Sequence, residues 1–240
     1  MTANRAKLFE GYERAIFSTG NTFSTQEYEM MSEFYSSNYA PYLPHKKDAR
    51  ILDVGCGAGH FLYFLKARGY TAMTGIDLSP GLIDHCRRKI WVNVIHGDAV
   101  EYLERNPSSF ELVCANDIVE HVPKGDVVGF LSACRRGLAT GGRLLVKVPN
   151  MSNPFASDLR YRDFTHEAGY TESSLRQILC LAGFETVRVV GSVHPAKGWK
   201  ARAHRVAEKA LHAFIRRALM EMNYSVPSTF SKLLVAVAQG

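Results

Sequence analysis

The sequence has no Cys-x-x-Cys pair and no long apolar run. Its five cysteines are an odd number and are widely spaced along the 240 residues. That usage indicates free thiols in a reducing compartment rather than disulfides. No stretch approaches the roughly 18 uninterrupted apolar residues of a membrane-spanning helix, and the first residues lack the apolar block of a signal peptide. We therefore expect a cytoplasmic protein.

A strong charge of one sign is also lacking. The 29 Lys and Arg against 23 Asp and Glu leave a net charge of +6, which is too mild to argue for a nucleic-acid partner. Hydrophobic residues make up 46% of the chain, enough for a large core, and this excludes a disordered or collagen-like protein. The length fits one domain, or one domain with a lid.

Short apolar runs alternate with helical patterns through the middle of the chain. This order is typical of an α/β protein, with a mostly parallel sheet and helices on both faces. Strands are expected at 50–54, 71–76, 92–96, 110–115, 143–148, 186–193 and 232–238, and helices at 60–68, from 79 onward, at 126–138 (closed by Gly141 and Gly142) and at 173–182.

Polar residues stand at the ends of these strands, where ligands bind in open α/β sheets. A single Asp or Asn at such a point is commonly a helix cap or a turn residue. A whole row is better explained by a polar site at one edge of the sheet. The row consists of Asp53, Asp77, Asp98, Asn116, Asp117 and Asn150.

A glycine-rich turn follows the first strand, with Gly55, Gly57 and Gly59 at alternate positions. Glycine permits a tight turn and lets a ligand press against bare backbone. Asp77 follows Gly55 by 22 positions, and a carboxylate there can bind both hydroxyls of a ribose. From these residues alone the ligand is an adenosine cofactor, either NAD or another class.

Four segments in this order resemble the class I S-adenosylmethionine-dependent methyltransferases: 51–60 (ILDVGCGAGH), 75–80 (GIDLSP), 97–98 (GD) and 116–121 (NDIVEH). The resemblance implies a Rossmann-like sheet of seven strands with a reversed last strand, and S-adenosylmethionine as the cofactor. It also implies a set of cofactor-binding residues. These are Asp53, Gly55, Cys56, Gly57, Gly59, Asp77, Leu78, Asp98, Ala99 and Asn116.

A second set of segments is similar to methyltransferases found with bacterial surface-polysaccharide synthesis: 148–150, 160–167 (RYRDFTHE), 170–176 and 182–184. This resemblance implies an O-methyltransferase that acts on a sugar or glycan hydroxyl. Related enzymes methylate quinone precursors and other small molecules, so a phenol acceptor is the alternative. A second alternative is a module that binds the cofactor without catalysing methyl transfer.

A sugar hydroxyl is a poor nucleophile until its proton is removed, so a base within about 3 Å of it is expected. His166 is the first candidate, with Asp163 to orient it or to touch the substrate. His121, next to Glu120, is the second. For each histidine the structural alternative is an imidazole that only fixes a loop through hydrogen bonds.

Arg160 and Tyr161 are the candidate substrate-binding residues, because they offer hydrogen bonds and a stacking face to a sugar. Acidic and imidazole groups at one edge can also bind a divalent metal. No His-x-x-x-His or similar ligand spacing appears, so we expect no metal. The signatures of RNA methyltransferases are absent as well, so we expect no nucleic acid.

The remaining segments flank this core. Residues 1–47 are expected to form N-terminal helices at 5–17 and 25–37, with Tyr35 and Tyr39 either closing over the cofactor as lid residues or only packing on the core. Residues 48–193 form the methyltransferase core, 194–230 a helical insertion and 231–240 the last strand.

The insertion is basic, with seven Lys or Arg against two Glu between residues 197 and 222. Apolar residues recur every three or four positions, which predicts an amphipathic helix. One hypothesis is contact with anionic lipid, or with a lipid-linked or phosphorylated glycan. The other is an apolar face that covers the domain or a partner subunit, which would allow a homo-oligomer.

Overall fold

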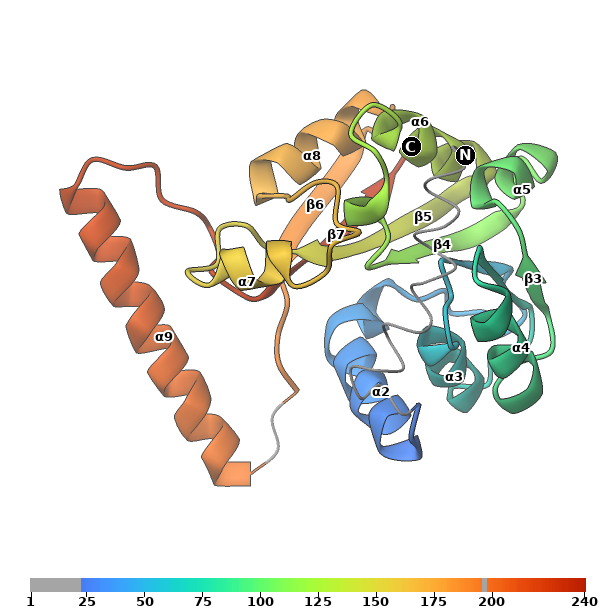
Figure 1. Ribbon diagram of the computed structural model, residues 1–240, viewed down its shortest axis with the longest axis horizontal. Coiled ribbons are helices and arrows are strands. Elements are labelled where there is room, and N and C mark those ends of the chain that lie inside the picture. Colours follow the sequence, from blue (N-terminus) through green and yellow to red (C-terminus); the bar gives the residue numbers. More distant parts are fainter. Residues whose placement is uncertain (1–22, 196–197) are drawn as a thin grey trace.

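Seven strands form one sheet in the computed structural model, which describes residues 23–195 and 198–240 (Figure 1). In chain order they are β1 (Ile51–Val54), β2 (Met73–Asp77), β3 (Val94–His96), β4 (Phe110–Asn116), β5 (Leu138–Pro149), β6 (Thr186–Gly191) and β7 (Leu233–Gln239). Across the sheet the order is β3-β2-β1-β4-β5-β7-β6. Only β7 runs opposite to the other six strands. The predicted α/β class with a reversed last strand is confirmed.

The fifth strand starts five residues earlier than the sequence predicts. Leu138 pairs with Phe110, and the pairing resumes at Arg143 after a shift in register. The intervening glycines absorb this irregularity: Gly141 has a φ of +74°, and a Cβ on Gly142 would meet the Phe110 carbonyl oxygen at 2.8 Å. The two glycines therefore form a bulge inside β5, and the prediction that they close the preceding helix is wrong.

The helices are α2 (Thr25–Tyr39), α3 (His60–Ala67), α4 (Pro80–Lys89), α5 (Ala99–Arg105), α6 (Val127–Gly137), α7 (Ala156–Tyr161), α8 (Glu172–Leu181) and α9 (Gly198–Glu221), with short 3₁₀ helices η1 (Ala40–Tyr42) and η2 (Val119–His121). The sequence did not indicate α5 or α7, which are the two shortest of these α-helices. The helix predicted at 5–17 lies outside the described residues.

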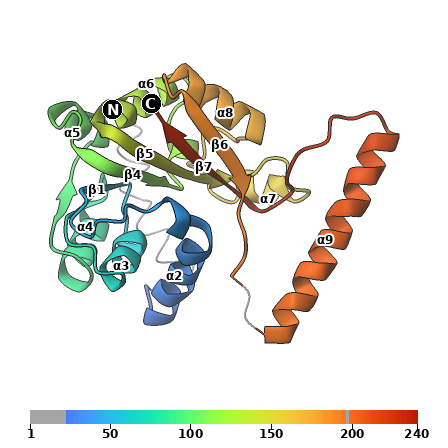
Figure 2. The same cartoon turned by 180° about the vertical axis from the view of Figure 1, so that it is seen from behind.

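Both faces of the sheet are covered (Figure 2). Alternate residues of the strands point to opposite faces, as in Leu52 and Val54 on one side and Ile51 on the other. Residues of α5, α6 and α8 pack on the first face, and residues of α2, α3 and α4 on the second. The sheet is thus held rigidly, with its carboxyl edge free to carry a site.

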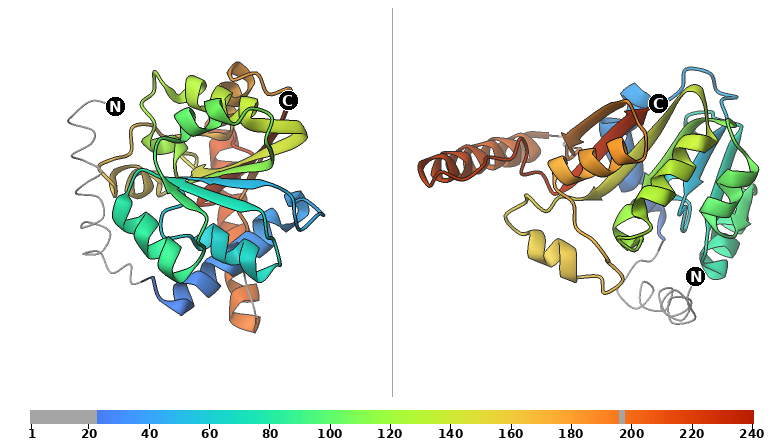
Figure 3. Two further views of the ribbon diagram at one scale, coloured as in Figure 1. Left: turned by 90° about the vertical axis from the view of Figure 1, so that its right-hand side faces the viewer. Right: turned by 90° about the horizontal axis from the view of Figure 1, so that it is seen from above.

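Helix α9 stands away from this layered core (Figures 1 and 3). The predicted helix is present, but the expectation that its apolar face covers the domain is wrong. Val206 and Phe214, which belong to that face, are 68% and 72% exposed. Within the described part of the chain, no helix is both long enough and apolar enough to cross a membrane.

Candidate active site

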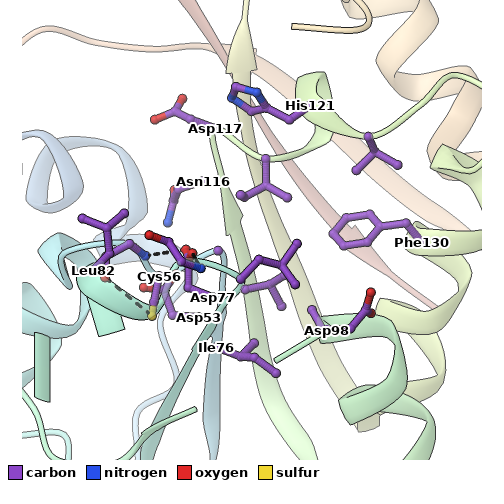
Figure 4. Close-up of a pocket in the computed structure, with 18 of the residues that line it drawn as sticks. Asp53, Cys56, Ile76, Asp77, Leu82, Asp98, Asn116, Asp117, His121 and Phe130 are labelled. Carbon is purple, nitrogen blue, oxygen red and sulfur yellow. Dashed lines mark hydrogen bonds between the residues drawn. The ribbon is translucent and has the colours of Figure 1, made fainter. Parts of the chain in front are cut away.

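A cavity of about 1490 Å³ opens at the carboxyl edge of the sheet. It is larger than a typical small-molecule pocket of roughly 300–1,000 Å³, so it has room for a cofactor and an acceptor together. Figure 4 shows Asp117 and His121 at one end and Asp98 at another, with Asp53 and Asp77 near the glycine turn. Except for Gly59, all predicted cofactor residues line this cavity: Asp53, Gly55, Cys56, Gly57, Asp77, Leu78, Asp98, Ala99 and Asn116.

The glycine turn between β1 and α3 requires glycine at each position. Gly55, Gly57 and Gly59 have positive φ angles of 67°, 49° and 88°. A Cβ on Gly55 would stand 2.0 Å from Ile118 Cδ1, and one on Gly59 would stand 2.5 Å from Cys86 Sγ. The atom nearest to a Cβ added on Gly57 would lie 3.9 Å from it. The Gly57 backbone therefore faces the open cavity, where a ligand can approach closely.

Asp77 ties this turn to the end of β2. Its Oδ2 accepts a hydrogen bond from the Gly57 amide at 2.9 Å, and its Oδ1 accepts one from the Ser79 amide at 2.8 Å. Backbone amides thus fix the orientation of the carboxylate at the cavity wall. Asp98 has the role of a helix cap, since its Oδ1 accepts from the first amides of α5.

Asp53, at the end of β1, is 2% exposed. Burial and the nearby charge of Asp77 raise the pKa of this carboxyl from 3.8 to about 8, against the opposing effects of Asn116 and Lys147. Burial makes this carboxyl difficult to ionise, and a cation bound beside it would favour the ionised form. The floor of the cavity is therefore suited to a positively charged ligand.

Helix α2 closes one side of the cavity with Glu27, Met31 and Tyr35. Glu27 pairs with His60 of α3 at 3.2 Å. Tyr39, the second predicted lid residue, is fully buried and donates to Asn116 Oδ1 at the end of β4. Glu27 and His60 could not be assigned to the site from the sequence, because nothing in it shows that α2 packs beside the glycine turn.

Lys147 and Asp117 are further site residues that the sequence did not single out as a pair. Lys147 is 3% exposed, and its ammonium lies 2.7 Å from Asp117 Oδ2. Asp117 has a φ of +52°, which is rare for a residue other than glycine. The strained backbone places this carboxylate on the cavity wall and lets it neutralise a buried lysine.

His121 lines the other end of the cavity and is buried. Its Nδ1 lies 2.8 Å from Thr165 Oγ1, and that hydroxyl donates to Asp163 Oδ1 at 2.7 Å. Burial, with a contribution from His166, lowers the pKa of His121. Burial disfavours the charged form of Asp163, but the hydrogen bonds from Thr165 and the nearby imidazoles lower its pKa overall.

His166, the first candidate base, lies behind His121 and does not line the cavity. The two rings meet edge to face with their centroids 4.7 Å apart. Glu120, His121 and His166 each offer one atom to a potential metal site, and these atoms lie within 4.8 Å of one another. Donors on a bound Zn²⁺ lie about 2.0–2.2 Å from the ion, and this is the distance that the three atoms would have to reach to hold one.

Arg160 and Tyr161 also lie away from the cavity lining. The Arg160 guanidinium donates to the backbone carbonyls of His166 and Glu167, at 2.6 and 3.1 Å. The Tyr161 side chain is 77% exposed. The structure therefore gives Arg160 a role in holding the 160–167 segment.

A model of the methyltransferase domain family matches residues 28–189, more than half of the chain. The chain belongs to this family. The predicted enzyme class is thereby confirmed, and the cofactor is S-adenosylmethionine. The site fits it. Asp53 suits its cationic methionine portion, the Gly57 backbone is open to a ligand, and the Asp77 carboxylate suits ribose hydroxyls.

Among curated relatives, the ubiquinone biosynthesis O-methyltransferase of Xylella fastidiosa (strain 9a5c) is 37% identical over 107 residues, covering 42% of each chain. The protein of the same name from Aromatoleum aromaticum is 30% identical over 106 residues, covering 42% of this chain and 44% of its own. The chain thus spans less than half the length of these relatives. Their names do not support the predicted link to surface polysaccharide.

Two solved structures share the fold. A SAM-dependent methyltransferase from Archaeoglobus fulgidus is 23% identical with a TM-score of 0.66, covering 89% of this chain and 94% of its own. A SAM-dependent methyltransferase from Thermotoga maritima, described as a possible histamine N-methyltransferase, is 17% identical with a TM-score of 0.61. Those matches cover 97% of this chain and 96% of the Thermotoga chain.

Proposed function

We propose that this methyltransferase transfers the methyl group to a hydroxyl of a small phenol-type acceptor, with His121 as the general base. The observation that carries the proposal is the chain of hydrogen bonds from Asp163 through Thr165 to His121. It ends on an imidazole in the cavity wall, where an acceptor can reach it.

The hydrogen bonds also assign the tautomer of His121. Thr165 has one hydroxyl hydrogen, which it donates to Asp163, so its oxygen accepts from His121 Nδ1–H. The neutral ring then carries its lone pair on Nε2, the atom that can take a proton. S-adenosylmethionine supplies an activated methyl group, and the protein's part is to position the hydroxyl in line and remove its proton.

The walls next to His121 favour an aromatic acceptor. Ile118, Val122 and Pro123 line the cavity on either side of His121 in the sequence. The two residues expected to bind a sugar, Arg160 and Tyr161, are not part of the lining. The relatives named as ubiquinone biosynthesis O-methyltransferases point to the same class of acceptor.

Methyl transfer to two classes of acceptor tests this proposal. The protein is supplied with S-adenosylmethionine labelled in the methyl group and with either catechol-type phenols or nucleotide sugars. We expect label on the phenol hydroxyl and none on the sugars. Label on sugar hydroxyls alone would overturn the phenol acceptor and restore the glycan one.

A further inference from the structure

One side of helix α9 faces the rest of the protein and carries both polar and apolar residues. Ile215 and Leu219 are half-buried there. Arg205 lines a groove of about 290 Å³ together with Glu33 and Ser36 of α2. Arg216 donates to the Ser228 carbonyl oxygen at 3.1 Å, and the His212 ring packs on Phe230 with centroids 5.5 Å apart.

The opposite side of α9 carries an apolar stripe, made of Trp199, Ala203, Val206, Ala210 and Phe214. At 3.6 residues per turn these positions lie roughly 100–180° around the helix from Arg205. The bulky members, Trp199, Val206 and Phe214, are 75%, 68% and 72% exposed. A continuous exposed stripe of this kind marks an interaction surface.

The charge around the stripe identifies its partner. Helix α9 holds six Lys or Arg against two Glu, and the exposed Arg202 and Lys209 lie along one border of the stripe. A second copy of α9 packed on the stripe would bring cations against cations. An anionic membrane surface instead attracts the cations while its interface takes up the apolar side chains.

We infer that α9 is a membrane-docking helix that lies in the surface of an anionic lipid bilayer, with the stripe from Trp199 to Phe214 facing the acyl chains. The large side chains of the stripe occur only once in about two turns, and alanines separate them. Binding of such a helix depends on the cations as well as on apolar burial. It is therefore reversible and sensitive to salt.

Flotation of the full chain with lipid vesicles tests the inference. The vesicles are phosphatidylcholine alone, or phosphatidylcholine with about 30% phosphatidylglycerol, in about 0.1 M salt. We expect the protein to float with the anionic vesicles at least tenfold more strongly than with the neutral ones. Failure to bind the anionic vesicles, or equal binding to both, would overturn the inference.

Pairs of variants, one on α9 and one elsewhere on the surface, test whether α9 makes the contact with the vesicle. Val206→Asp should weaken vesicle binding by about tenfold, whereas Val92→Asp, at a valine 74% exposed beside β3, should change it less than twofold. Lys209→Glu should weaken it by about fivefold, with Lys89→Glu on α4 as the control of equal charge. Equal losses in variant and control would remove α9 from the contact.

Light scattering, which gives the mass of the protein in solution, tests whether a second copy of the chain packs on the stripe instead. We expect Val206→Asp to leave the mass unchanged. A native dimer that Val206→Asp converts to a monomer, without vesicle binding by either form, would assign the stripe to a second copy and overturn the inference.

Discussion

The two ends of the cavity are assembled in different ways. At the cofactor end, adjacent strands hold the turn, as when the Gly57 amide donates to Asp77 at the end of the neighbouring strand. At the acceptor end, His121 is held by Thr165, 44 positions later, on a segment outside the sheet. The cofactor end is thus part of the rigid fold, whereas the acceptor end depends on how the segment after α7 folds back. We expect changes at the first end to alter stability and cofactor binding, and changes at the second to alter the rate of transfer.

The largest effect is expected at the glycine turn. Gly59→Ala places a Cβ 2.5 Å from Cys86 Sγ at a φ of +88°. Left-handed strain and overpacking together should lower the free energy of unfolding by about 2–5 kcal/mol, as measured by urea denaturation. Gly69→Ala is the control, because φ is +81° there and no atom lies within 4 Å of the added Cβ. It should lose only about 1–2 kcal/mol of strain energy. Equal losses would show that the packing of the turn on α4 is unimportant.

Replacement of Asp53 should make the folded protein more stable and its binding of the cofactor weaker. Its folded pKa of about 8 exceeds the unfolded value of 3.8, so its contribution to stability is lost as the pH rises toward and through 8. Asp53→Asn should therefore raise the free energy of unfolding by a few kcal/mol at pH 9 and by almost nothing below pH 4. It should also weaken S-adenosylmethionine binding by about tenfold, since a charged partner of the methionine ammonium is lost.

Thermal or urea unfolding of Asp53→Asn at several pH values, with calorimetric titration of the cofactor, checks both effects. The surface variant Asp48→Asn should change stability by less than about 0.5 kcal/mol at every pH. A gain in Asp53→Asn that does not grow between pH 4 and 8 would contradict the assigned pKa.

At the acceptor end, Asp163→Asn should lower kcat by about tenfold while KM for the cofactor stays within about twofold, because Asp163 positions His121 through Thr165 and does not line the cavity. Asp158→Asn on α7 breaks only the exposed ion pair with Arg162 and should leave kcat unchanged. Steady-state kinetics of the two variants compares them. Equal kcat values would remove the positioning role of Asp163.

The smallest effect is expected from a chelator. If His121 is a base, removal of divalent ions should leave the rate within about twofold of its original value. A rate that falls with chelation and returns with an added divalent ion would reassign Glu120, His121 and His166 to a metal site.

The same difference between the two ends decides what could be predicted from the sequence. Asp53, Gly57 and Asp77 could be placed together at the edge of the sheet because strand order and turn chemistry act over short distances along the chain. Which of His121 and His166 lines the cavity could not be predicted, since only the folded 160–167 segment shows which ring reaches it.

Helix α9 gives a related lesson. Its periodicity predicted a helix with an apolar side. The direction of that side depends on the contacts of Arg205 and Arg216, which the pattern does not contain. Asp98 shows the opposite case, in which the simple interpretation as a helix cap describes the hydrogen bonds of its Oδ1.

The most direct test of the account is His121→Asn, measured for both turnover and ligand affinity. The account predicts that kcat falls by about 10²–10³-fold, the typical contribution of a general base, while the Kd for S-adenosylhomocysteine changes less than about threefold. A variant that transfers methyl groups at the native rate would contradict the assignment of His121 as the base.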